Sequence, residues 1–86
     1  MVKEVRWRVY IVRCADDTLY TGISIDVDRR CHAHNAGRGA KYTRSRRPVK
    51  VVYVSLPMTK SGALREENRI KSLTRTAKLM IIKENS

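Results

Sequence analysis

Two short segments rich in β-branched and aromatic residues lie close together near the start of the chain. The first is WRVYIVRC, residues 7–14, and the second is LYTGI, residues 19–23. Such compositions are typical of β-strands. The Ala-Asp-Asp-Thr segment between them is typical of a turn, because Asp and Thr side chains bond to the nearby backbone. The sequence therefore predicts a β-hairpin, with Val9 and Ile11 on one face and Tyr10 and Val12 on the other.

Capping residues and apolar spacing predict three helices after the hairpin. Ser24 or Asp26 can cap the first of them. The helices are expected over residues 26–35, over residues 59–73 and from residue 74 onward, with a third strand over residues 49–54. The order is then β-β-α-β-α-α. This order predicts an α+β fold in which helices flank a three-stranded, mainly antiparallel sheet.

The length of the chain, 86 residues, is that of one small domain. We expect a single domain over residues 1–86, with its core at about residues 7–82. No run of about 18 apolar residues is present, so no membrane-spanning helix is expected. The N-terminal segment lacks a signal-peptide pattern, and Cys14 and Cys31 do not make a disulfide framework. These features predict a cytoplasmic protein with reduced thiols and no disulfide-linked partner.

The positive charge of the chain is large and unevenly distributed. The net charge is +11, and residues 29–65 contain no Asp or Glu. A surface of one sign indicates a polyanionic partner. Nucleic acid is the first candidate. A membrane surface is the second, because the basic segment lacks the apolar face that an interfacial helix needs.

The segment GRGAKYTRSRRP, residues 37–48, is rich in glycine and arginine and is predicted to be a loop. With a tyrosine among the basic residues, it is suited to follow a nucleic-acid backbone and to stack on bases. A plain solvated loop is the alternative. The residues expected to bind nucleic acid are Arg29, Arg38, Lys41, Tyr42, Arg44, Arg46 and Arg47.

Glu67 lies in the apolar stripe of the second predicted helix. It is four residues after Ala63 and three before Ile70, so all three share a face. A carboxylate directed at a core costs several kcal/mol unless a cation or a metal ion meets it. Glu67 is therefore either a metal ligand or a glutamate at the rim of the core that pairs with an arginine.

Two tyrosines, an arginine and this glutamate together have the chemistry of a phosphodiesterase site. Tyr10 and Tyr20 lie on the two hairpin strands, and either alone is typical of a core. A metal ion held by Glu67 can polarise a phosphate. An arginine such as Arg30 can hold phosphate oxygens at two points. A phenol can position a water molecule or take its proton.

The order and spacing of these residues resemble the GIY-YIG nuclease domain. The resemblance rests on VYIV (residues 9–12), on Tyr20-Thr21-Gly22, on Arg30 eight positions after that glycine, on Glu67 in ALREENRIKSL and on KYTRSRRPV. It covers about residues 7–82 and is strongest with small stand-alone bacterial-type members. Arg8 stands where the first motif has glycine, and Thr21 where the second has isoleucine. The bulk of Arg8 is expected to narrow the groove.

The resemblance implies cleavage of nucleic acid with a single metal ion. Position by position it makes Tyr10 the general base, Tyr20 a group that orients the nucleophile, and Arg30 the ligand of the scissile phosphate. Glu67 would bind Mg²⁺ or Mn²⁺. His34 stands where stand-alone members carry a histidine, and it either relays a proton or packs beside Arg30.

Three alternatives remain. Cys14, Cys31, His32 and His34 are possible zinc ligands, although the spacing lacks a C-x-x-C pair. The second alternative is a non-catalytic nucleic-acid-binding module, and the third is a basic structural protein of a ribonucleoprotein. Our prediction is a metal-dependent endonuclease acting on DNA, with RNA as a second substrate class. A homodimer is a further possibility, because a small groove can need a second copy to hold a duplex.

Overall fold

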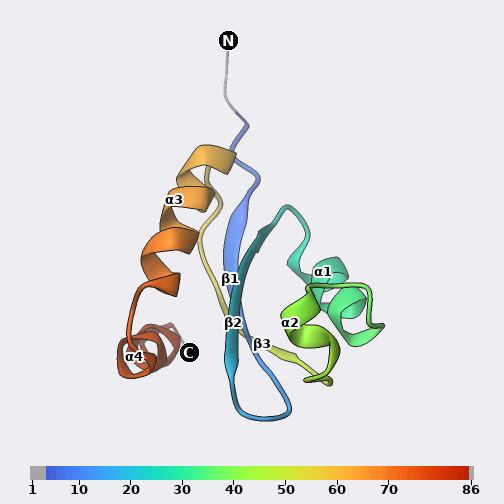
Figure 1. Cartoon of the computed structure of the whole chain (residues 1–86). Helices are drawn as coiled ribbons and strands as arrows, with labels where there is room; N and C mark the ends of the chain where they lie inside the picture. Colours follow the sequence, from blue (N-terminus) through green and yellow to red (C-terminus); the bar gives the residue numbers. More distant parts are fainter. Residues whose placement is uncertain (1–3, 86) are drawn as a thin grey trace.

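The computed structural model describes residues 4–85, and it confirms the predicted fold class. The elements run in chain order from β1 (Arg8–Arg13) and β2 (Leu19–Ser24) through α1 (Val27–Asn35), α2 (Lys41–Arg44) and β3 (Lys50–Val54) to α3 (Lys60–Lys71) and α4 (Arg75–Glu84) (Figure 1). The short helix α2 is an addition, because it lies inside the segment predicted as loop. No helix within residues 4–85 is long and apolar enough to cross a membrane.

The three strands form an antiparallel sheet in the order β2-β1-β3. The hairpin register places Tyr10 opposite Gly22 and Val12 opposite Tyr20. Tyr10, Val12, Tyr20 and Gly22 therefore share one face of the sheet. β1 is the central strand, so β2 and β3 are the two edges.

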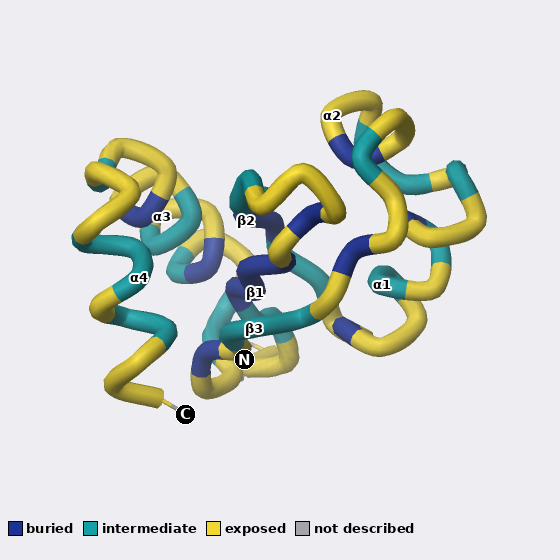
Figure 2. Tube along the Cα trace, turned by 90° about the horizontal axis from the view of Figure 1, so that it is seen from below, coloured by how far each residue is buried: buried dark blue, intermediate teal, exposed yellow. Residues whose placement is uncertain are grey.

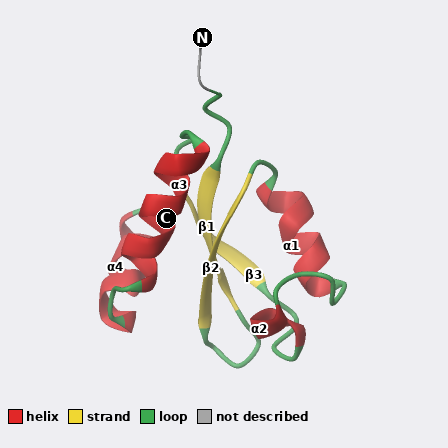
Figure 3. Cartoon of the chain, turned by 45° about the horizontal axis from the view of Figure 1, so that its top comes forward, coloured by secondary structure: helices red, strands yellow, loops and turns green. Residues whose placement is uncertain are grey.

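Helices cover both faces of the sheet (Figures 1 and 3). α1 and α2 lie on one side, and α3 and α4 lie on the other. Buried residues concentrate on the strands between them (Figure 2). Tyr10 and Val12 pack into the cluster on the α1 side, whereas Val9 and Ile11 pack with α3. The predicted alternation along β1 is confirmed.

The helix starts follow the predicted caps. Asp26, Thr59 and Thr74 are the N-cap residues of α1, α3 and α4, and each side chain accepts a hydrogen bond from a backbone N–H three residues later. A cap of this kind contributes about 1 kcal/mol. Ser24 instead accepts from the Asp26 N–H and donates to the Asp26 carbonyl.

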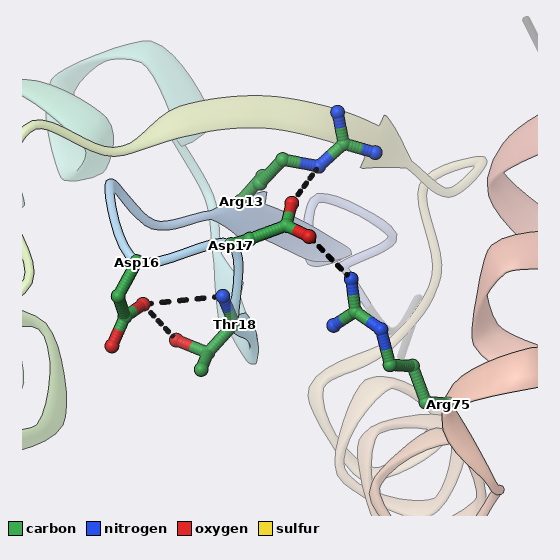
Figure 4. A network of polar contacts seen from close by, with 5 residues as sticks. All are labelled: Arg13, Asp16, Asp17, Thr18 and Arg75. Atoms are coloured by element: carbon green, nitrogen blue, oxygen red, sulfur yellow. Dashed lines mark hydrogen bonds and ion pairs between the residues drawn. The ribbon is translucent and has the colours of Figure 1, made fainter.

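The hairpin turn is joined to α4 by an exposed carboxylate (Figure 4). Asp17 Oδ1 lies 3.5 Å from Arg13 Nε, and its Oδ2 accepts from Arg75 Nη2 at 3.1 Å. The neighbouring Asp16 side chain accepts from the backbone N–H and hydroxyl of Thr18. Exposed pairs of this kind contribute little stability. Their effect is positional, because they hold the start of α4 beside the start of β2.

Candidate active site

The five residues predicted for catalysis come from four separate elements. They are Tyr10 of β1, Tyr20 of β2, Arg30 and His34 of α1, and Glu67 of α3. The Tyr10 hydroxyl lies 2.8 Å from His34 Nε2, and the ring centroids of Tyr20 and His34 are 5.4 Å apart. Arg30 and Glu67 lie close enough for their charges to act on the Tyr10 phenol. The structure therefore brings Tyr10, Tyr20, Arg30 and His34 together, with Glu67 on α3 near enough for its charge to act on the Tyr10 phenol.

Tyr10 is almost completely buried, with 1% of its surface exposed. The pKa of Tyr10 is raised to about 12, mainly by burial and to a smaller extent by the nearby Tyr20 and Glu67, while Arg30 opposes the shift. The phenol is therefore neutral at pH 7. It can act as a base toward a water molecule only if its own proton moves to another group, and His34 is the group in contact.

Gly22 provides the space that the Tyr10 ring occupies. A Cβ atom at Gly22 would lie 2.6 Å from the Tyr10 Oη and 2.8 Å from its Cζ. Real Cβ atoms essentially never come so close to a neighbouring atom. The glycine of the Tyr-Thr-Gly segment is therefore required by packing across the hairpin and not by its own backbone conformation.

His34 is fully buried, and both of its ring nitrogens have partners. Nε2 faces Tyr10, and Nδ1 lies 2.7 Å from Thr43 Oγ1. Burial lowers the pKa of His34, and the positive charge of Arg30 lowers it further. The imidazole is therefore neutral at pH 7 and able to accept a proton. The prediction left open whether His34 relays a proton or only packs beside Arg30, and this geometry suits a relay.

Thr43 and Gly39 complete the surroundings of His34, and neither was predicted. Thr43 is fully buried, and its hydroxyl donates to the Ala40 carbonyl at 3.0 Å. A Cβ atom at Gly39 would overlap His34 Nδ1. The sequence signal is weak, because a threonine between basic residues in KYTR shows nothing of a contact nine residues away.

Glu67 is largely covered, with 15% of its side chain exposed, and its Oε2 lies 3.4 Å from Lys71 Nζ. The ion-pair partner is thus a lysine one turn later, where the alternative prediction expected an arginine. Within residues 4–85 no group of three or more His, Cys, Asp or Glu side chains could hold a metal ion. Mg²⁺ is commonly held by one or two carboxylates, with water and substrate phosphates supplying the other ligands. The single carboxylate of Glu67 fits that mode of binding.

The same observation applies to the zinc alternative. Cys14, Cys31, His32 and His34 do not come together as a metal-binding group in the described part of the chain. His34 is instead engaged by Tyr10 and Thr43. Cys31 lies against the Val49 carbonyl, with its Sγ 3.9 Å away. These four side chains therefore do not form the zinc site of that alternative within residues 4–85.

Several residues predicted to bind nucleic acid hold the loop around α2 together. Arg46 Nε donates to Asp16 at 3.0 Å, and its guanidinium lies 4.0 Å from the centre of the Tyr42 ring. The Tyr42 ring also stacks on Tyr20, with centroids 5.8 Å apart. Arg47 donates to the backbone carbonyls of Arg44 and Asn35. A base that stacked on Tyr42 would have to compete with these contacts.

Arg8 does not narrow the site in the way that its bulk suggested. Its Nη1 donates to the Ser55 carbonyl at 3.0 Å. Ser55 follows β3, which is the sheet edge opposite to β2. The arginine that replaces the glycine of the first motif is therefore directed away from Tyr20 and Arg30.

The family model of the GIY-YIG catalytic domain matches residues 6–80. The chain belongs to the GIY-YIG family. A UPF0213 protein of Staphylococcus aureus is 55% identical over 76 residues, which cover 88% of this chain and 93% of that protein. GIY-YIG membership makes this chain a member of a nuclease family, and the name of the relative states no activity.

Two solved structures are similar to this GIY-YIG domain. The solution NMR structure of UPF0213 protein BH0048 from Bacillus halodurans is 42% identical, with a TM-score of 0.58, and the match covers 90% of this chain and 82% of that one. The solution NMR structure of protein EF2693 from E. faecalis is 36% identical, with a TM-score of 0.63, and the match covers 98% and 90%. Both support the small single-domain form of the GIY-YIG fold.

Proposed function

We propose that this GIY-YIG protein is an endonuclease that uses a divalent metal ion to hydrolyse phosphodiester bonds of DNA. The observation that carries the proposal is the buried hydrogen bond between Tyr10 and His34, set beside Arg30 and Glu67. The phenol and the imidazole satisfy each other's hydrogen bonds in the core, and at 2.8 Å they are close enough for a proton to pass between them when the phenol takes a proton from water.

In the proposed reaction Tyr10 takes a proton from the attacking water as its own proton passes to His34 Nε2. The water oxygen bonds to phosphorus, and the bond from phosphorus to the leaving oxygen breaks. Arg30 holds two oxygens of the phosphate and stabilises the added negative charge. Tyr20, whose ring contacts His34, orients the water. A Mg²⁺ or Mn²⁺ ion on Glu67 would supply Lewis-acid stabilisation of the phosphate and of the leaving oxygen.

The relay requires one tautomer of His34. The Thr43 hydroxyl has a single hydrogen, and it donates to the Ala40 carbonyl. In the proposed tautomer its oxygen accepts a hydrogen from His34 Nδ1 at 2.7 Å, and this shorter contact takes precedence over the 3.4 Å approach of the Ala40 N–H to the same nitrogen. That tautomer leaves Nε2 without a hydrogen and able to accept the Tyr10 proton. Thr43 is therefore proposed as a positioning residue that acts through His34.

The test is cleavage of a labelled panel of single-stranded, duplex, nicked, flapped and branched DNA, together with RNA. Wild type is compared with Glu67→Gln and Arg30→Ala in Mg²⁺, in Mn²⁺ and in chelator. Products that need metal and that vanish in both variants are the expected result. Binding to every substrate without cleavage would overturn the proposal and support the non-catalytic binding module, whose affinity would not respond to chelator.

Three further predictions depend on this function. DNA is proposed ahead of RNA as the substrate, and the same panel decides between them. A cytoplasmic location is proposed because the substrate is intracellular nucleic acid. A homodimer stays a prediction, and sedimentation of the protein with and without duplex DNA would test it.

A further inference from the structure

Two basic clefts flank the candidate active site at the two ends of β2. A cleft of about 450 Å³ lies at the end of the strand, where Ser24, Arg6, Arg29 and Arg30 are among the lining residues. A second cleft, of about 220 Å³, lies at the start of the strand, and it is lined by Thr18, Leu19, Tyr42, Arg75 and Lys78. Tyr20 and Gly22, which border the active site, lie between these ends.

β2 can serve as the floor of a continuous path between the clefts. It is an edge strand of the sheet, with α1 and α2 on one side and α3 and α4 on the other (Figures 1 and 2). Six residues at about 3.3 Å each give a span of roughly 20 Å. One strand of a nucleic-acid duplex advances about 3.4 Å per nucleotide, so the path has room for about six nucleotides.

The basic groups along this path are held in place or weakly paired. Arg75 pairs with Asp17 at the start of β2, and this pair is exposed and weak as well (Figure 4). Lys78 makes no ion pair with any residue from 4 to 85 that the structure records. At the other end Arg6 Nε lies 3.2 Å from Glu4 in an exposed pair, which a phosphate can displace at little cost. Asp26 is already engaged as the cap of α1.

We propose that the substrate strand lies along the edge of β2. It enters between Tyr42 of α2 and Arg75 and Lys78 of α4, crosses Arg30, and leaves past Arg6 and Arg29. The contacts are to phosphates, so binding along this path is independent of base sequence. The proposal rests on the proposed function for its ligand, a nucleic-acid strand, and it adds Arg6, Arg75 and Lys78 to the residues expected to bind it.

The test measures DNA affinity against salt concentration in a Glu67→Gln background, where cleavage does not interfere. Each phosphate contact contributes roughly 0.7 to 0.9 to the slope of log K against log salt. The double variant Arg6→Ala/Lys78→Ala is expected to reduce that slope by about 1.4 to 1.8. The matched control is Lys50→Ala/Arg65→Ala, which removes the same charge from exposed positions on β3 and α3.

A clear loss of slope in the first pair with little change in the control supports the path along β2. An equal loss in both pairs would overturn it, since net charge alone would then explain binding. An unchanged slope in the first pair would overturn it as well. Binding is measured without cleavage, so the two proposals can fail separately. If the slope shows no path along β2, the nuclease proposal still stands. If the wild type does not cleave but the slope changes as expected, the path still stands.

Discussion

Gly22 lies directly opposite Tyr10 in the β1–β2 pairing, and a Cβ atom there would lie 2.6 Å from the Tyr10 hydroxyl oxygen. The space for the Tyr10 phenol is thus created by an absent side chain on the neighbouring strand. Overpacking of this kind costs roughly 1 to 3 kcal/mol, because the ring must leave its rotamer or the strands must shift.

Gly22→Ala is therefore expected to lower the free energy of unfolding by about 1 to 3 kcal/mol and to reduce cleavage through displacement of Tyr10. Urea denaturation measures the first effect. Gly62→Ala is the comparison, because its Cβ would lie 3.2 Å from Thr59 Oγ1, a tight approach that a few tenths of an ångström of movement relieves, in a helix where alanine is favoured. Equal stability in the two variants would contradict the packing argument.

Thr43→Val removes the hydroxyl next to His34 Nδ1 while nearly preserving the shape of the side chain. His34 Nδ1 then keeps only the Ala40 N–H, at 3.4 Å, as a partner, which favours the tautomer without a hydrogen on Nδ1, and the lost hydrogen bond costs about 1 kcal/mol. We expect a lower kcat with KM little changed, a shift of the His34 ¹⁵N resonances away from the Nδ1–H tautomer, and recovery in Thr43→Ser. Unchanged ¹⁵N resonances in Thr43→Val would show that Thr43 does not set the tautomer.

Stability is expected to fall as the pH drops below about 6.5, because the pKa of His34 is lowered in the folded protein. Below 6.5 the unfolded chain binds a proton at this residue that the folded protein does not, so acid favours unfolding. The free energy of unfolding keeps falling until the pH reaches the lowered pKa of folded His34, and it then levels off. His34→Asn should remove this part of the pH dependence measured by urea denaturation.

Glu67→Gln is expected to abolish Mn²⁺ binding, measured by electron paramagnetic resonance in the presence of DNA, while DNA affinity persists. The neutral amide keeps the shape of the side chain but loses the charge that a hard cation needs. Glu66→Gln is the control one residue earlier, where the carboxylate pairs with Arg69. Loss of Mn²⁺ in the control alone would assign the metal to the other glutamate.

The fold was predictable wherever local chemistry decides it. The hairpin, the alternation of Val9 and Tyr10 between the two faces, and the helix starts at Asp26 and Thr74 all depend on residues close in sequence. The short helix α2 was not predicted, because the glycines and arginines of residues 37–48 are typical of a loop. The helix has four residues, and Thr43 is its only fully buried side chain.

The residues of the candidate site were predictable through the family resemblance. The residues that contact them and hold them in place were not. His34 meets Thr43 only because the loop after α1 folds back over it. Arg46 has the sequence character of a nucleic-acid ligand, yet its carboxylate partner, Asp16, lies thirty positions earlier. Charge in a sequence does not show which cations are already paired, whereas the three-dimensional structure does.

The most direct test of the central claim is single-turnover cleavage of the best DNA substrate by wild type and Tyr10→Phe, with Mg²⁺ and with chelator. Phenylalanine preserves the ring beside Gly22 and removes only the hydroxyl that contacts His34. We expect metal-dependent cleavage by wild type and a loss of about 10²- to 10⁴-fold in Tyr10→Phe with DNA affinity retained. Equal rates in the two proteins would contradict it.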